Sequence, residues 1–306
     1  MLAMGGVLAL FAALSFTLDN IFIRKGLLGE KPGTVWDVRF IVSSTCLMLF
    51  IIGAVVATLL GYPFVQELMQ LSLTDILLLV VAGILGPFAG AFLFSTAIAQ
   101  IGASHTSALW TGANPLFAAL LGVVFMGDIP DLLGIISVLM IIGGILIVGY
   151  HGHAETTKVL ETKLAGGLLA ILSGVCIALS QVVRGTAMTM GATTNTALFV
   201  YQGTAFFVVT AVLLFKRKNL LHIKQISRRS LLCYTVSGTG MLLGSYFLLA
   251  SFNFIPVWQA VAIRNIQPLF AILFSCLLLK KVDRISFRLV LGATLVTAGV
   301  VILNVY

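Results

Sequence analysis

The sequence predicts an all-α integral membrane protein, in which ten transmembrane helices form two inverted five-helix repeats. Three observations lead to this fold class: the composition is strongly apolar, ten segments are long enough to cross a bilayer, and the second half repeats motifs of the first. Of the 306 residues, 60% are hydrophobic and 9% are charged, whereas soluble domains average about 45–50% apolar and about 25% charged residues. A soluble fold could not bury this much apolar surface.

Ten apolar segments define the predicted spans. A helix needs about 20 apolar residues to cross the hydrocarbon core of a bilayer. The predicted spans 1 to 10 are residues 2–23, 36–60, 74–99, 103–126, 132–150, 165–187, 195–215, 230–252, 256–279 and 285–305. The first has neither a basic region before it nor a small-residue cleavage site, so we interpret it as a span and not as a removed signal peptide.

Motifs of the first half return in the second half. Residues 114–118 read NPLFA in span 4, and residues 267–271 read QPLFA in span 9, 153 positions later. The GxxxG motif at 86–90 in span 3 likewise returns at 240–244 in span 8. A GxxxG motif lets two helix backbones approach closely. Recurrence in the same order at about half the chain length indicates an internal repeat.

Each half contains five spans, and a polar joint at 151–163 connects them. Because five is an odd number, the second half enters the membrane from the opposite side, which gives an inverted repeat about an axis in the membrane plane. We therefore expect two domains, 1–150 and 151–306, each a five-helix repeat. Many transporters bind their substrate between such repeats, so carriage of a solute is the leading functional hypothesis.

The basic residues predict the orientation in the membrane. Of the eighteen Lys and Arg residues, sixteen lie in or beside the loops after spans 1, 5, 7 and 9: Arg24, Lys25, Lys31, Arg39, Lys158, Lys163, Lys216, Arg217, Lys218, Lys224, Arg228, Arg229, Lys280, Lys281, Arg284 and Arg288. Arg184 stands alone on the other side, and Arg264 lies within a span. By the positive-inside rule, the odd-numbered loops are expected in the cytoplasm and both termini outside. This bias explains the net charge of +8 without a nucleic-acid partner.

Several short motifs occur in a fixed order along the chain: Arg39 near the start of span 2, the SAL and NPLFA runs of 107–118, the Gly-Asp turn at 127–128, the glycine-rich end of span 5, and the QPLFA run. On these motifs the chain resembles the drug/metabolite transporter superfamily, specifically its ten-span EamA-type members. The resemblance implies efflux or exchange of a small metabolite by alternating access to a central cavity between the repeats. Members of this family are often described with both termini in the cytoplasm, opposite to the orientation that the charges predict.

Arg264 is the first candidate for substrate binding. A charge at the centre of a span costs about 2.5–3.5 kcal/mol on insertion scales, so Arg264 needs a partner or a water-filled cavity. Arg264 and Gln267 share one face of a helix, and a guanidinium can bind a carboxylate or phosphate through two hydrogen bonds. The predicted substrate is therefore an amino-acid-like or anionic solute. The alternative is a structural ion pair between Arg264 and Asp19.

Further substrate-binding candidates lie on spans 2, 4 and 7. They are Arg39, Trp110, Thr111, Asn114, Tyr201 and Gln202. Thr111 is the repeat counterpart of Arg264, and Tyr201 and Gln202 align roughly with Arg39. A small polar residue opposite a large cation would make the pocket asymmetric. The alternative for the span 4 residues is hydrogen bonding between helices.

Asp19 and two prolines are candidates for coupling and movement. Asp19 is the one acidic residue well inside a predicted span, and buried carboxylates can titrate near neutrality. We predict that it couples transport to a proton; the alternative is an interfacial ion pair with Arg24 or Lys25. Pro115 and Pro268 each remove a backbone hydrogen bond within a span, so both are predicted hinges.

The remaining features favour secondary transport over other membrane functions. The sequence has no Walker motif, so the predicted driving force is a proton or counter-substrate gradient. The four cysteines fall inside spans without a CxxC pair, and the four histidines are scattered, so we expect no metal and no cofactor. The alternatives are a polytopic enzyme acting on lipid-like substrates and a channel. We expect a monomer or homodimer among the lipids of the plasma or inner membrane, with no nucleic-acid partner.

Overall fold

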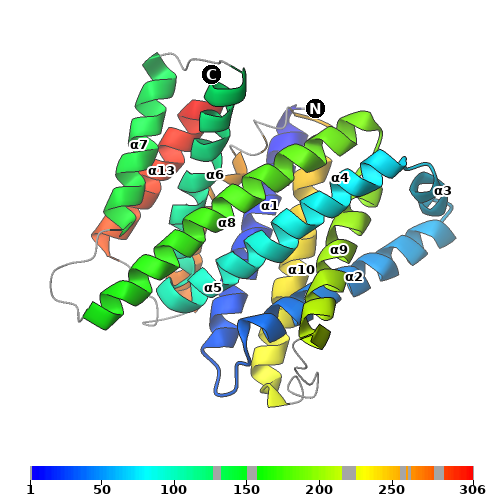
Figure 1. Cartoon of the computed structure of the whole chain (residues 1–306), viewed down its shortest axis with the longest axis horizontal. Coiled ribbons are helices and arrows are strands. Elements are labelled where there is room, and N and C mark those ends of the chain that lie inside the picture. Colours follow the sequence, from blue (N-terminus) through cyan, green and yellow to red (C-terminus); the bar gives the residue numbers. More distant parts are fainter. Residues whose placement is uncertain are drawn as a thin grey trace.

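In the computed structural model, every regular element among the described residues is a helix. The structure describes residues 2–126, 132–149, 157–215, 225–255, 260, 263–278 and 286–305. The N-terminal end of the first helix and the C-terminal end of the last lie at the same end of the bundle (Figure 1). The all-α part of the predicted fold class is therefore confirmed for the described part of the chain.

The helices follow the predicted spans closely in most places. The first half contains α1 (Leu2–Leu27), α2 (Val35–Leu59), α3 (Phe64–Met69), α4 (Leu73–Gly83), the π-helix η1 (Ile84–Gly90), α5 (Ala91–Ile101), α6 (Ala103–Met126) and α7 (Leu132–Gly149). The second half contains α8 (Thr157–Met190), α9 (Thr194–Phe215), α10 (Arg228–Ser251), α12 (Gln267–Leu278) and α13 (Phe287–Val305). The third predicted span therefore corresponds to α4, η1 and α5 in succession.

Six helical segments of the described residues are long and apolar enough to cross a membrane: Met4–Leu27, Val35–Leu59, Leu73–Ile101, Thr162–Met190, Thr194–Phe215 and Arg228–Ser251. Leu132–Val148, Gln267–Leu278 and Phe287–Ile302 are shorter apolar helices. Span 9 differs most from its prediction, since its described helix begins only at Gln267, after a turn at Asn265 and Ile266. The total of ten spans stays a prediction.

Local sequence sets where the helices begin. The first backbone N–H groups of a helix lack partners within it, and α2 and α4 satisfy two of them with capping boxes, Thr34 with Asp37 and Ser72 with Asp75. Between α5 and α6 the chain turns at Gly102, whose φ of 85° favours glycine because glycine has no Cβ. The connection between α5 and α6 is therefore a tight turn of a single residue.

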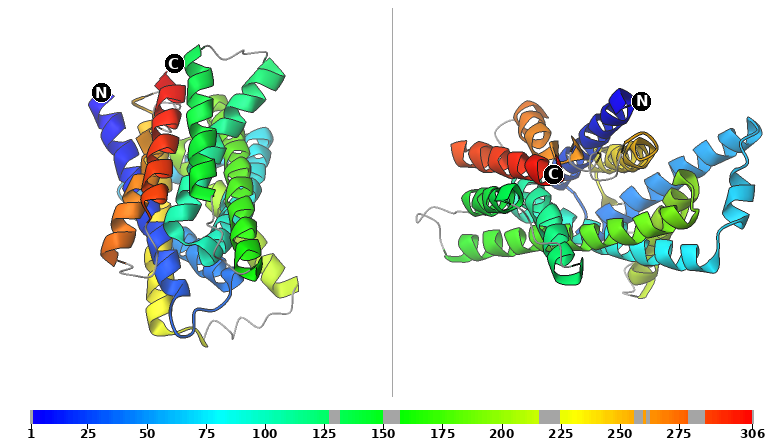
Figure 2. Two further views of the ribbon diagram at one scale, coloured as in Figure 1. Left: turned by 90° about the vertical axis from the view of Figure 1, so that its left-hand side faces the viewer. Right: turned by 90° about the horizontal axis from the view of Figure 1, so that it is seen from above.

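The two repeats are interleaved and do not form separate cores. α1 packs mainly on α10 and α12 of the second half, whereas α8 packs mainly on α4, η1, α5 and α6 of the first. α7 and α13 lie side by side at one edge of the bundle, and α3 lies at the opposite edge (Figures 1 and 2). The first helix of each repeat therefore crosses into the other repeat, and the space between the repeats lies at the centre of the molecule.

Two glycines show that the repeats have the same packing. A Cβ added to Gly83 at the end of α4 would lie 2.7 Å from the Cβ of Thr204 in α9. A Cβ added to Gly238 in α10 would lie 2.7 Å from the Cβ of Thr45 in α2. The same helix crossing is thus present twice, once in each orientation, and in both places only a glycine permits the close approach.

The repeats differ by one residue at η1. Gly86 stands three positions after Gly83, whereas its repeat counterpart Gly240 stands two positions after Gly238. A π-helical turn accommodates one additional residue in an α-helix, and η1 occupies this place in the first repeat only. The first repeat therefore carries an irregular helix at a point where the second repeat is regular.

Substitution of the two crossing glycines tests the packing symmetry. We expect Gly83→Ala and Gly238→Ala each to lower the free energy of unfolding by about 1–3 kcal/mol, the usual cost of overpacking. Gly53→Ala in α2 is the control, because a Cβ at Gly53 meets nothing within 4 Å and alanine favours helix by about 1 kcal/mol over glycine. Thermal unfolding in mild detergent measures all three. Equal stability of the three variants would contradict the close crossings.

Candidate functional site

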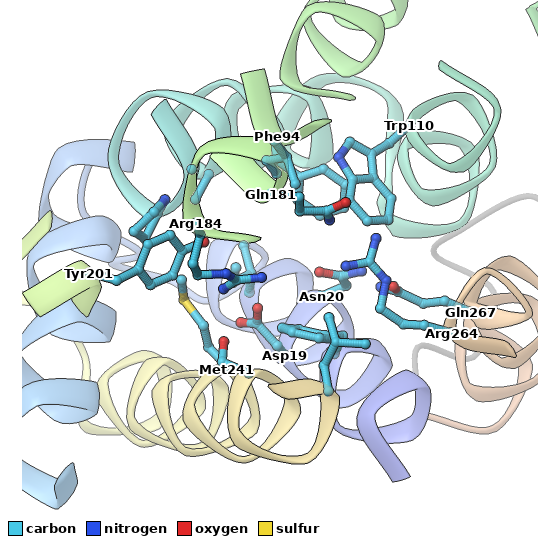
Figure 3. Close-up of a pocket in the computed structure, with 18 of the residues that line it drawn as sticks. Asp19, Asn20, Phe94, Trp110, Gln181, Arg184, Tyr201, Met241, Arg264 and Gln267 are labelled. Carbon is cyan, nitrogen blue, oxygen red and sulfur yellow. The ribbon is translucent and has the colours of Figure 1, made fainter. Parts of the chain in front are cut away.

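A cavity of about 90 Å³ lies where the two repeats meet. α1, α2, η1, α5 and α6 line it from the first half, and α8, α9, α10 and the segment around Arg264 line it from the second. Its walls are largely apolar, and its polar groups come from a small number of side chains (Figure 3). Apolar pockets with a few converging polar groups are typical of small-molecule sites.

Four charged side chains line this central cavity. They are Asp19, Arg39, Arg184 and Arg264, each at least 93% buried. Figure 3 shows Arg184 and Arg264 reaching in from opposite sides, with Asp19 and Asn20 between them. Among the described lining residues, three arginines thus face one carboxylate, and the site carries a formal excess of two positive charges.

The one carboxylate among the described residues of the site, Asp19, lies near Arg39. The Asp19 carboxylate accepts a hydrogen bond from the Ser237 hydroxyl of α10 and interacts electrostatically with the Arg39 guanidinium of α2. Arg24 instead donates to the backbone oxygens of Ile98 and Ala99 at 3.0 and 3.1 Å. The cation whose interaction with Asp19 is seen here therefore comes from α2.

The irregular helix η1 supplies a hydrogen-bond acceptor for Arg39. Pro87 lies inside η1 and has no backbone N–H, so it interrupts the regular helical hydrogen bonding. Its carbonyl oxygen accepts a hydrogen bond from Arg39 Nη2 at 3.1 Å, and Met241 Sδ lies 3.5 Å from the same nitrogen. Pro87 and Met241 directly follow the counterparts Gly86 and Gly240, so Arg39 contacts equivalent positions of both repeats.

Arg264 is held by aromatic rings at a break in span 9. Its guanidinium carbon lies 4.8 Å from the centre of the Trp110 ring and 5.7 Å from that of Phe16. Arg264 is followed by the turn at Asn265 and Ile266, before α12 begins. Its Nε and Nη2 atoms are buried without a hydrogen-bond partner in the structure, and such donors favour an added acceptor.

Arg184 in α8 was not among the predicted site residues. Its guanidinium carbon lies 4.8 Å from the centre of the Tyr201 ring, and its side chain is 5% exposed. Counting Arg184 as a charge on the outer side of the membrane was wrong, because the residue is buried at the cavity. A signal existed in the sequence: Gln181 and Arg184 lie in span 6 at about the depth at which Asp19 and Asn20 lie in span 1, so polar character recurs there.

The structure brings six of the predicted binding and coupling residues together at the cavity: Asp19, Arg39, Trp110, Tyr201, Arg264 and Gln267. Thr111, Asn114 and Gln202 are also buried, but they do not line it. Each of these three has polar side-chain atoms without a hydrogen-bond partner. Asn20, which the sequence analysis did not select, lines the cavity and donates to the Ser107 hydroxyl at 3.2 Å.

The two predicted hinge prolines lie in different surroundings. α6 continues as a helix through Pro115, whereas the turn at Asn265 and Ile266 directly precedes Gln267 and Pro268. The helical break at Asn265 and Ile266 therefore belongs to the second repeat and has no equivalent at Pro115 in α6. The irregular helix η1 belongs to the first repeat. The described residues contain no group of three His, Cys, Asp or Glu side chains that could hold a metal ion.

Comparison with known proteins identifies a family for nearly the whole chain. A family model described as "EamA-like transporter family" matches residues 3–150 and again residues 164–305. Among 22 matching chains of solved structures, one titled "Crystal structure of protein" has a TM-score of 0.59 and 14% sequence identity, covering 97% of this chain and 95% of that chain. This likeness shows a shared fold. A search of curated proteins finds no match.

Proposed function

This chain belongs to the EamA-like transporter family, a family of membrane transporters of the drug/metabolite type, and we propose that it carries a small anionic metabolite. The central cavity is the proposed substrate site, and the proposed mechanism is secondary active export or exchange by alternating access. Membership of a transporter family favours this function over the alternatives of a lipid-modifying enzyme and a channel.

The positive excess in the central cavity is the observation that carries the proposal. Charges interact far more strongly in a low-dielectric interior than in water, so uncompensated guanidinium groups there attract anions and repel cations. Arg264 offers unpartnered N–H groups in addition to its charge. A carboxylate or phosphate would accept from these groups and would lower the cost of keeping the arginine in the membrane.

Two irregular helical segments beside the cavity support alternating access. Transporters built from inverted repeats often place broken helices at the substrate site, where the freed backbone groups face the cavity. Here η1 contributes Gly86 and Pro87 to the wall, and the break in span 9 is flanked by Arg264 and Gln267. Both segments are proposed to change conformation between the inward-open and outward-open states.

Asp19 remains the proposed coupling residue. It is the acidic residue among the described lining residues, and it faces Arg39. Protonation of Asp19 would leave Arg39 uncompensated and would increase the attraction of the cavity for an anion. Binding of a proton and binding of the substrate are thereby linked, and exchange against a counter-substrate is the alternative.

The orientation with the odd-numbered loops in the cytoplasm of an inner or plasma membrane is also proposed. The ends of α1 and α13 lie at one end of the bundle (Figure 1), as an even number of spans requires. Arg39 and Arg184 line the cavity, so neither counts toward the loop charges. The remaining basic residues still gather beside the odd-numbered loops, which favours cytoplasmic placement of that side.

Thermal unfolding in mild detergent tests the proposed function. A ligand that binds only the folded protein stabilises it by RT ln(1 + [L]/Kd), about 2.7 kcal/mol at a hundredfold excess over Kd. We expect carboxylated or phosphorylated solutes to raise the melting temperature, whereas choline and putrescine leave it unchanged. Arg264→Gln should abolish the stabilisation by anions.

Arg229→Gln is the matched control for this experiment, because Arg229 is an exposed arginine in the first turn of α10. This variant should respond to anions as the wild-type protein does. Stabilisation by cationic solutes alone, or equal anion responses in wild type and Arg264→Gln, would overturn the assignment of the cavity as an anion site.

A further inference from the structure

The charges of the central cavity are compensated unequally. Asp19 and Arg39 interact with each other, and Arg39 also donates to the Pro87 carbonyl. Among the described lining residues, this leaves Arg184 and Arg264 without an acidic partner. The two positive charges of the site can therefore be assigned to two particular side chains.

Both of these arginines stack on the face of an aromatic ring. Arg184 stacks on Tyr201, and Arg264 stacks on Trp110, each at 4.8 Å from the ring centre. A stacked guanidinium keeps its N–H groups in its own plane, directed away from the ring. The rings thus stabilise the two cations without using their hydrogen-bonding edges, which remain available to a ligand.

The two guanidinium groups repel each other across the cavity. Arg184 is an electrostatic neighbour of Arg264, and the two side chains point toward each other from opposite sides (Figure 3). A ligand with one negative charge can neutralise only one of them. A ligand with two separated negative charges would contact both and would remove the repulsion, which a monoanion leaves in place.

Three amide side chains also line the cavity: Asn20 and Gln181 lie between the two arginines, and Gln267 lies beside Arg264 (Figure 3). Amides donate and accept hydrogen bonds and therefore suit the oxygen atoms of carboxylate or phosphate groups. The cavity volume of about 90 Å³ is below the range of about 300–1,000 Å³ that is usual for drug-sized ligands. Both features fit a short, polar solute.

We infer that the substrate is a small organic dianion, whose two negative groups bind Arg184 and Arg264 at the same time. The inference rests on the proposed anion transport and adds the number and spacing of the substrate charges. Short dicarboxylates have this chemistry, because their two separate carboxylates are both ionised at neutral pH. The Asp19–Arg39 pair then serves coupling and does not bind the substrate charges.

Matched solutes that differ by one charge test the inference. Succinate is a dianion, and succinamate has the same length but an uncharged amide in place of one carboxylate. Binding is measured by calorimetry on purified full-length protein in mild detergent, and malonate and malonamate form a second, shorter pair. We expect wild type to bind at least one dianion about tenfold or more tightly than its partner of lower charge.

Substitution of either arginine should remove this preference for the dianion. In Arg184→Gln and in Arg264→Gln, the dianion affinity is expected to fall about ten- to a hundredfold, and the ratio between dianion and monoanion should approach one. Arg229→Gln, the exposed control, should keep the wild-type ratio. A residue with only a structural role would lower both affinities together and leave the ratio unchanged.

The outcomes separate this inference from the proposed function. Equal binding of dianions and monoanions, with a loss in Arg264→Gln alone, overturns the two-arginine site and leaves anion transport standing. Absence of any anion binding at millimolar concentration overturns both. The ratio of dianion to monoanion affinity is measured on the wild-type protein alone. It therefore tests the inference even where a glutamine variant does not fold.

Discussion

Replacing Arg39 with leucine is expected to lower the free energy of unfolding by about 3–5 kcal/mol, the typical effect of removing the counter-charge of a buried carboxylate. The buried Asp19 carboxylate would lose its interaction with the Arg39 guanidinium, and the Pro87 carbonyl would lose its hydrogen bond from Arg39. Thermal unfolding in detergent measures the change. We expect Arg39→Leu to be among the least stable single variants of the chain.

The double variant Asp19→Asn with Arg39→Leu separates the effect of the two opposite charges from that of side-chain packing. Replacement of both partners of a buried pair is often close to neutral, so the double variant should recover most of the lost stability. Asp19→Asn also keeps an oxygen acceptor for the Ser237 hydroxyl. Additive effects of the two substitutions would contradict the pairing of Asp19 with Arg39.

Trp110→Ala should lower the free energy of unfolding by about 3–5 kcal/mol, the usual range for removing a buried tryptophan side chain. Trp110 is 5% exposed, packs edge-on against Phe94 with 5.8 Å between the ring centres, and provides the face on which Arg264 stacks. Anion binding should weaken as well, because Arg264 would lose the contact that orients it.

Trp110→Phe is the matched variant, since phenylalanine keeps an aromatic face. The indole Nε1 has no hydrogen-bond partner in the structure, so the phenyl ring gives up no hydrogen bond. We expect Trp110→Phe to keep most of the stability and most of the anion affinity. Anion affinity as low in Trp110→Phe as in Trp110→Ala would show that the ring face does not support Arg264.

The sequence predicted the helical fold well because its strongest signals are local. Spans are set by runs of apolar residues, and the hairpin at Gly102 is set by a single glycine with positive φ. The additional residue of η1 and the break at Asn265 were not predicted. Each depends on how helices pack in three dimensions, and Pro87 looked less informative in sequence than Pro115, which belongs to a repeated motif.

The site was harder to predict, because a position along a span does not say which way a side chain points. Arg264 and Asp19 stood out since charges inside a span are costly. Arg184 was missed because it lies near the end of its predicted span, where a charge seemed to need no explanation. The structure shows that α8 continues to Met190, which places Arg184 well inside the helix.

Thr111, Asn114 and Gln202 show again that the position of a residue along a span does not reveal which way its side chain points. Thr111 follows Trp110 directly, so the two side chains lie about 100° apart on α6, and the larger one occupies the cavity wall. Gln202 is likewise next to Tyr201, which takes the cavity side of α9. Helical periodicity could propose both residues of each pair, and only the packing of the neighbouring helices selects between them.

The central claim is that the cavity between the repeats attracts anions and becomes open to water during transport. Charged thiol reagents test it directly at Gln181→Cys, in a variant whose four native cysteines are replaced with serine or alanine. We expect the anionic methanethiosulfonate ethylsulfonate to react about tenfold or more faster than the cationic trimethylammonium reagent, relative to their rates with a free thiol. Arg264→Gln should reduce this ratio. A faster cationic reagent would contradict the positive cavity, and no reaction with either reagent would contradict its opening to water.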